Sequence, residues 1–128
     1  MKITNRKILT DANFLGQLTQ KQLPIKISYA LAKNISKIEN ELKIYNSEKD
    51  KLIDQYAIKD EKGNLKVDEN NQFKVREEYK EVWEKEIEEL LDIEINLDVH
   101  KIKLDELMLS NCNMTPAELM LIDYMIEE

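Results

Sequence analysis

The chain has few of the residues that interrupt or cross-link a fold. Its 128 residues include two glycines, two prolines and one cysteine. A single cysteine excludes an intrachain disulfide, which agrees with a reducing compartment. So few glycines and prolines also exclude long flexible linkers and low-complexity tracts. Length and composition therefore predict a single domain over residues 1–128 that is built mainly from helices.

Long apolar runs are absent too. No stretch approaches the roughly 18 apolar residues that a membrane span needs. The basic start, from Met1 to Lys7, is followed by apolar residues that polar ones interrupt, so it does not have the apolar core of a signal peptide. We therefore expect a cytoplasmic protein that has no membrane partner.

Negative charge is present in excess and is unevenly distributed. The net charge is −7; residues 1–56 carry ten Lys and Arg against six Asp and Glu, whereas residues 76–98 carry three against ten. An acidic protein is a poor candidate for direct nucleic-acid binding, because contacts to phosphates supply most of that affinity. The charge therefore favours a protein partner.

Apolar spacing predicts two helices in the first 56 residues. The first runs from about Asn5 to Thr19, with Thr4 or Asn5 as its cap. The second opens at Pro24, since proline fits the first turn of a helix, and extends to about Tyr56. It carries a heptad seam, eight residues that recur at steps of four and three along one face: Leu31, Ile35, Ile38, Leu42, Tyr45, Lys49, Leu52 and Tyr56.

A turn-rich insert follows this long helix. The segment Asp60–Asn64 contains Gly63, which can take a positive φ, and apolar residues flank it, so a short β-hairpin is predicted. Residues 68–71 form a second polar turn. Residues 60–71 do not match a calcium loop, because Lys62 and Leu65 occupy places where that loop needs oxygen ligands or glycine.

A third helix is predicted from about Val75 to Leu91, antiparallel to the second. Five of its residues should face inward: Tyr79, Val82, Trp83, Ile87 and Leu90. Over residues 93–104 apolar and polar residues alternate, which favours a half-buried strand over continued helix. Such a strand can pair with the hairpin or with its neighbour across the molecule.

A short helix should end the chain. Thr115 can cap it, Pro116 fits its first position, and Glu118 can close a capping box. The predicted fold is therefore mainly α (α+β): a long antiparallel helical hairpin, a small β-hairpin or strand insert, and short N- and C-terminal helices. Four methionines near this end can fill the core or line an adaptable groove, and core filling is favoured: Met108, Met114, Met120 and Met125.

Candidate catalytic residues are scarce. His100 is the only histidine, and Asp98 would share its strand face, but no third partner follows in the local sequence. Cys112 has no nearby basic residue to lower its pKa. The chain also has no phosphate-binding Gly-rich loop, zinc spacing or Gly-x-Ser-x-Gly elbow. We therefore predict no enzyme, no metal and no cofactor.

Acidic residues of the third helix are the best candidates for a binding site. They recur at steps of four and three along its outer face: Glu77, Glu81, Glu84, Glu88 and Asp92. A carboxylate-bridged metal site in a helix bundle also needs Glu-x-x-His pairs, which one histidine cannot supply. The face is either an ordinary solvated one or a mimic of nucleic-acid charge that occupies a basic groove on another protein.

Four parts of the sequence follow one another: the segment Leu23–Asn34, the long helix, the insert from Asp60 to Asn64, and the ending Met114–Leu119. In this order they resemble small phage and prophage proteins of a family without known function. This resemblance implies a bacteriophage or prophage of a low-GC host, a bias that the use of Lys, Ile, Asn and Glu also indicates. It implies a place in the cytoplasm of the bacterial host cell, and it brings no catalytic residues.

Two functions follow as hypotheses. The first is a non-enzymatic protein that binds a host or phage protein, and that can inhibit a nucleic-acid-binding defence effector of the CRISPR type through the acidic helix. The second is a structural or assembly protein that oligomerises along the heptad seam, for instance as a homodimer. They differ in whether the third helix or a second copy covers the seam.

Overall fold

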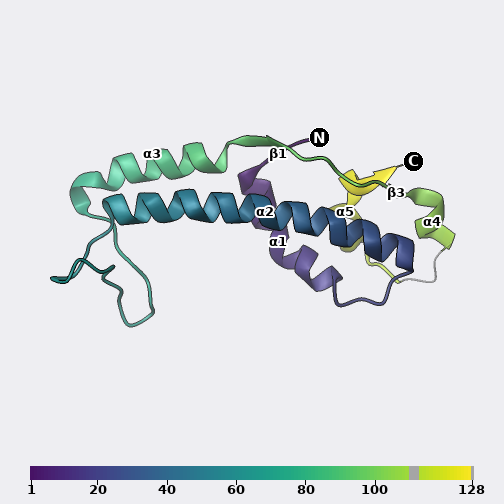
Figure 1. Ribbon diagram of the computed structural model, residues 1–128, viewed down its shortest axis with the longest axis horizontal. Helices are drawn as coiled ribbons and strands as arrows, with labels where there is room; N and C mark the ends of the chain where they lie inside the picture. The colour runs from purple at the N-terminus through teal and green to yellow at the C-terminus, as the bar shows by residue number, and fades with distance from the viewer. Residues whose placement is uncertain (110–112, 128) are drawn as a thin grey trace. The chain divides into compact units, whose positions relative to one another are not determined.

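The computed structural model describes residues 1–109 and 113–127, and it is mainly helical (Figure 1). It contains the predicted long helix, helix pair, small β-hairpin and short helices, which confirms the predicted fold class. Cys112 lies outside the described residues. The elements are β1 (Lys2–Thr4), α1 (Asn5–Leu18), α2 (Ile25–Tyr56), η1 (Glu77–Tyr79), α3 (Lys80–Leu91), β2 (Glu94–Asn96), β3 (Ile102–Lys103), α4 (Leu104–Leu109), α5 (Pro116–Leu121), η2 (Asp123–Met125) and β4 (Ile126–Glu127).

Local signals place the helix starts as predicted. The Thr4 hydroxyl accepts a hydrogen bond from the Lys7 backbone N–H, 3.2 Å away, and thereby caps α1. Pro24 directly precedes α2, and its carbonyl accepts the N–H of Ser28 at 2.9 Å. At α5 the capping box is complete, because Thr115 and Glu118 each accept the other's backbone N–H.

The chain divides into two compact units. Unit 1 combines Met1–Leu42 with Glu94–Glu128, and unit 2 is Lys43–Ile93. That the whole chain forms one domain stays a prediction.

Two small sheets belong to unit 1. Strand β1 pairs antiparallel with β2, placing Ile3 opposite Ile95, and β3 pairs in parallel with β4, placing Ile102 opposite Ile126. The predicted 93–104 strand is therefore present only in part, as β2 and β3 in two different sheets. Residues 97–101 between them are not in a strand, and helix α4 begins at Leu104, where the alternation predicted more strand. The partners are the two ends of the described chain. Neither strand pairs with the hairpin of the insert, which is one of the two partners expected from the sequence.

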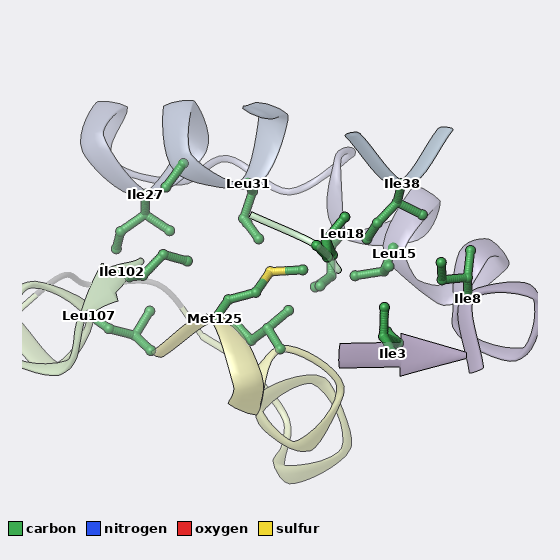
Figure 2. Close-up of a cluster of buried hydrophobic side chains, with 13 residues drawn as sticks. Ile3, Ile8, Leu15, Leu18, Ile27, Leu31, Ile38, Ile102, Leu107 and Met125 are labelled. Carbon is green, nitrogen blue, oxygen red and sulfur yellow. The ribbon is translucent and has the colours of Figure 1, made fainter. Parts of the chain in front are cut away.

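The core of unit 1 contains thirteen buried apolar residues, and Figure 2 shows Met125 in its midst. They come from α1, α2, the strands and the C-terminal segment: Ile3, Ile8, Leu15, Leu18, Ile27, Ala30, Leu31, Ile38, Leu97, Ile102, Leu107, Ile122 and Met125. One fully buried polar residue, Asn34, lies on α2. Its amide accepts the backbone N–H of His100 at 2.7 Å and donates to the His100 carbonyl at 2.9 Å. Both hydrogen-bonding groups of this loop residue are thereby satisfied.

Unit 2 is a helix pair with an irregular insert. Figure 1 shows α3 running antiparallel beside the C-terminal end of α2. Aromatic contacts join the parts: the Tyr56 and Tyr79 ring centroids lie 5.4 Å apart, and the Phe73 and Trp83 rings meet edge to face at 5.7 Å.

The third helix departs from the prediction at its start and on one face. It opens as the 3₁₀ turn η1, and α3 proper begins at Lys80. Tyr79 and Val82 were predicted to face inward, yet both are exposed. Successive residues are turned by about 100°, so the buried stripe of Trp83, Ile87 and Leu90 leaves Val82 on a different face.

The insert repeats one turn geometry eight residues apart. Asp60 accepts the backbone N–H groups of Lys62 and Asn64 at 2.9 Å, and Asp68 does the same for Asn70 and Gln72. Three residues after each aspartate the backbone takes a positive φ, 81° at Gly63 and 62° at Asn71. Glycine and asparagine tolerate that conformation best. Isolated antiparallel bridges complete the insert: Lys59 with Leu65 in the predicted hairpin, Val67 with Phe73 around the second turn, and Ala57 with Val75 at its base.

Candidate protein-binding surface

The five predicted site residues, which we name the acidic stripe, are all exposed. Glu77 lies in η1, Asp92 caps the end of α3, and three members lie on α3 itself: Glu81, Glu84 and Glu88. Steps of three and four bring these three onto one face of the helix. Among the residues that the structure describes, none forms an ion pair with the carboxylates of Glu77, Glu81 or Glu84. Their negative charge is therefore available to a partner.

Contacts on the inner side of α3 fix which way this stripe faces. The stripe lies opposite Trp83 and Ile87, which are half-buried, and near the buried Leu90 at the helix end. The Tyr56 hydroxyl of α2 donates a hydrogen bond to Glu86, 3.1 Å away. Burial raises the pKa of Tyr56, and the bonded Glu86 carboxylate raises it further. The phenol therefore stays a neutral donor at physiological pH and links α2 to α3.

A second face of the α3 segment, also partly exposed, was not predicted from the sequence. Two apolar and two acidic residues follow it at steps of four and three: Val82, Glu86, Glu89 and Ile93. Glu86 is half-buried and the other three are exposed, and Ile93 lies just after the end of α3. Beside this face lies a groove of about 390 Å³ between α2 and α3, which we name the α2–α3 groove. Its lining residues are Glu48 and Leu52 of α2 and Glu86, Glu89, Leu90 and Ile93. The sequence does contain this spacing of three and four residues. However, Val82 was predicted to face the helix core and Ile93 to begin the next strand, so the two were not placed on one face.

His100 and Asp98 lie between β2 and β3, outside the strands, so they do not share a strand face as predicted. The Asp98 carboxylate is fully exposed and lies 3.7 Å from the Lys37 ammonium. The His100 ring meets Tyr29 edge to face, with centroids 6.0 Å apart. Within the described residues, no group of three His, Cys, Asp or Glu side chains is placed to hold a metal ion.

The methionines divide between core and surface. Met125 is fully buried and Met114 packs against the same core, whereas Met108 and Met120 are exposed. The Met120 side chain is 77% exposed and borders two grooves of unit 1. The larger, of about 620 Å³ between α1 and α5, also contains Phe14 and the ion pair of Lys21 with Glu118. Hydrogen bonding from the Thr115 backbone and then from Lys21 lowers the pKa of Glu118, so that carboxylate is charged at neutral pH.

Comparison of the chain with protein-family models, curated proteins and solved structures gave no match. In the described part of the chain, none of the helices combines the length and the apolar character needed to cross a membrane.

Proposed function

We propose that this chain is a non-enzymatic phage or prophage protein that binds a host or phage protein through its acidic stripe. The observation that carries the proposal is the exposure of all five carboxylates on a helix whose other side is held by α2. The phage origin rests on the resemblance of the sequence. The partner we propose is a nucleic-acid-binding effector of host defence, of the CRISPR type, whose basic groove the stripe would occupy.

The spacing of the stripe supports charge mimicry. At a rise of about 1.5 Å per residue, neighbouring carboxylates of Glu81, Glu84 and Glu88 follow one another at about 4.5–6 Å along the axis. One strand of a nucleic acid carries one charge per about 3.4 Å of helix axis. The stripe is thus a somewhat sparser row of negative charge. It would be attracted to the same basic side chains, and salt would weaken the attraction.

Assembly through the heptad seam is the alternative, and the burial of the seam lends it no support. Each of the eight seam positions is buried or half-buried within one copy of the chain. Leu31 and Ile38 belong to the core of unit 1, and Ile35 and Leu42 pack against it. A second copy would have to displace these contacts to pair along the seam.

The test is capture from a bacterial lysate by the tagged chain and by two charge-matched variants. The first variant, E81K/E84K/E88K, reverses the stripe. The second, E39K/E61K/E69K, makes the same change at three exposed acids outside it. We expect the wild type and the second variant to retain the same nucleic-acid-binding protein at low salt, and to release it when nucleic acid or salt is added. We expect the first variant to retain none.

Two outcomes would contradict the proposal. Equal retention by the stripe variant at low salt would show that the stripe does not bind the partner. Retention of virion proteins alone, or only of further copies of the chain, would favour the assembly function. Circular dichroism and Trp83 fluorescence check that each variant is folded.

A further inference from the structure

The α2–α3 groove combines apolar surface with carboxylates in a way that the acidic stripe does not. Leu52, Leu90 and Ile93 line it; Ile93 is 48% exposed, and Val82 of α3 is 44% exposed. Three acidic residues line the same groove, Glu48, Glu86 and Glu89. A contiguous apolar surface rimmed by polar side chains is a feature of sites that bind another molecule.

The carboxylates are arranged to accept further positive charge. Glu48 is paired with Lys51 at 2.9 Å, an exposed pair that contributes little stability, and Glu86 accepts one hydrogen bond from Tyr56. Glu89 has no ion pair with any residue in the described ranges. Unit 2 as a whole carries ten Lys and Arg against fifteen Asp and Glu. An acidic segment would be repelled here, whereas a basic one is attracted.

The groove has room for a few bulky side chains of a peptide. Its volume of about 390 Å³ is near the lower end of the roughly 300–1,000 Å³ that is typical of drug-sized ligand sites. It also runs between two antiparallel helices, where a third helix can lay an apolar stripe. Recognition of an amphipathic helix in a groove works through apolar anchors spaced at three and four residues.

We propose that the α2–α3 groove binds a basic amphipathic helical segment of the partner protein. A bulky apolar side chain of that segment covers Leu52, Leu90 and Ile93, while its lysines or arginines meet Glu86 and Glu89. This inference rests on the proposed function, because it names the chemistry of the partner segment and adds a second contact beside the acidic stripe.

The probes are three labelled synthetic peptides of equal length, whose binding to the full chain is followed by fluorescence anisotropy. One is an amphipathic Lys/Leu helix, the second replaces its leucines with serine, and the third replaces its lysines with glutamate. We expect the Lys/Leu peptide to bind about tenfold more tightly than the Lys/Ser peptide, because burying one apolar side chain is worth about that factor. The Glu/Leu peptide should not bind.

Two pairs of variants locate the binding. Ile93→Ser should weaken the Lys/Leu peptide about tenfold, and Val67→Ser, an equally exposed apolar residue in the insert, should leave it unchanged. E86Q/E89Q should weaken it more than E81Q/E84Q, which removes the same charge from the stripe. Glutamine at 86 still accepts the hydrogen bond from Tyr56, so the fold is kept.

Each contrary outcome overturns the inference about the groove. None of them decides the proposed function, which the lysate capture with the stripe variant tests. Equal binding of the Lys/Leu and Lys/Ser peptides, or equal losses for the two glutamine variants, would mean that the peptide is held by general attraction between opposite charges and not by the groove. No binding of the Lys/Leu peptide would exclude the basic segment. Self-association that Ile93→Ser abolishes would assign the groove to a second copy.

Discussion

The two units of this chain differ in what they bury. Unit 1 gathers thirteen apolar side chains into one cluster, built from segments at both ends of the sequence. In the described part of unit 2 the buried apolar residues are Tyr45, Tyr56, Ala57 and Leu90, and the remaining packing relies on half-buried side chains, both aliphatic and aromatic. Because apolar burial is the main favourable term in folding, stability should depend chiefly on unit 1. Unit 2 carries the acidic stripe and the α2–α3 groove, so binding should depend on it.

The largest expected effect is the loss of a core side chain from unit 1. Met125→Ala should lower the free energy of unfolding by about 3–5 kcal/mol, because it removes a fully buried side chain from the middle of the cluster and leaves a cavity. Urea unfolding followed by circular dichroism measures it. Met120→Ala is the matched control on the surface and should change stability by less than about 0.5 kcal/mol.

The equivalent change in unit 2 sharpens the comparison. Leu90→Ala should cost about 2 kcal/mol, since Leu90 is buried beside an open groove where little cavity would form. Trp83, the only tryptophan, lies in unit 2 and reports its unfolding by fluorescence. A cost for Leu90→Ala as large as for Met125→Ala would contradict the difference in packing that we draw between the units.

Asn34 gives the next effect in size. Asn34→Ala should cost about 2 kcal/mol, because it removes two hydrogen bonds and leaves the backbone N–H and C=O of His100 without their partner. Asn40→Ala, an exposed asparagine on the same helix, is the control. Amide hydrogen exchange at His100 should also become faster in the Asn34 variant. An unchanged exchange rate would show that the side chain does not fix this loop.

Local signals explain what the sequence predicted well. Capping residues such as Thr4 and Thr115, and a proline at the first turn, determine where a helix starts through contacts that span only a few residues of sequence. The heptad seam marked the inner face of α2 correctly, since its eight positions are all at least half-buried. The acidic stripe was likewise predictable as an exposed face, because helical spacing alone decides which carboxylates align.

Features that depend on distant segments were not predictable in this way. Strands β3 and β4 are two residues long, too short for a periodic pattern, and they exist because segments far apart in the chain pair. Val82 fits an apolar helix stripe by spacing, and only the rotation of α3 against α2 shows that it faces outward. The α2–α3 groove was missed for the same reason, since Glu48 and Leu52 come from another helix.

The smallest effects come from two tyrosines, one in each unit, whose hydroxyl groups are treated differently. The Tyr124 hydroxyl of unit 1 is buried and has no hydrogen-bond partner among the described residues, whereas Tyr56 of unit 2 donates to Glu86. Tyr124→Phe should therefore raise stability by up to about 1 kcal/mol, because it removes an unsatisfied buried polar group. Tyr56→Phe should lower stability. Urea unfolding of both variants at neutral pH tests the opposite signs.

The effect of Tyr124 on stability should depend on pH in the alkaline range. Burial, and to a lesser extent the negative charge of Asp11, raises its pKa to about 12. An unfolded tyrosine titrates near pH 10, so between about pH 10 and 12 the unfolded state loses this proton before the folded state does. The contribution of the neutral phenol to stability is therefore complete below about pH 10 and is lost as the pH rises toward 12. Unfolding curves of the wild type and of Tyr124→Phe should consequently diverge above pH 10, with the variant losing less stability. Parallel curves would mean that solvent reaches this hydroxyl in the folded chain.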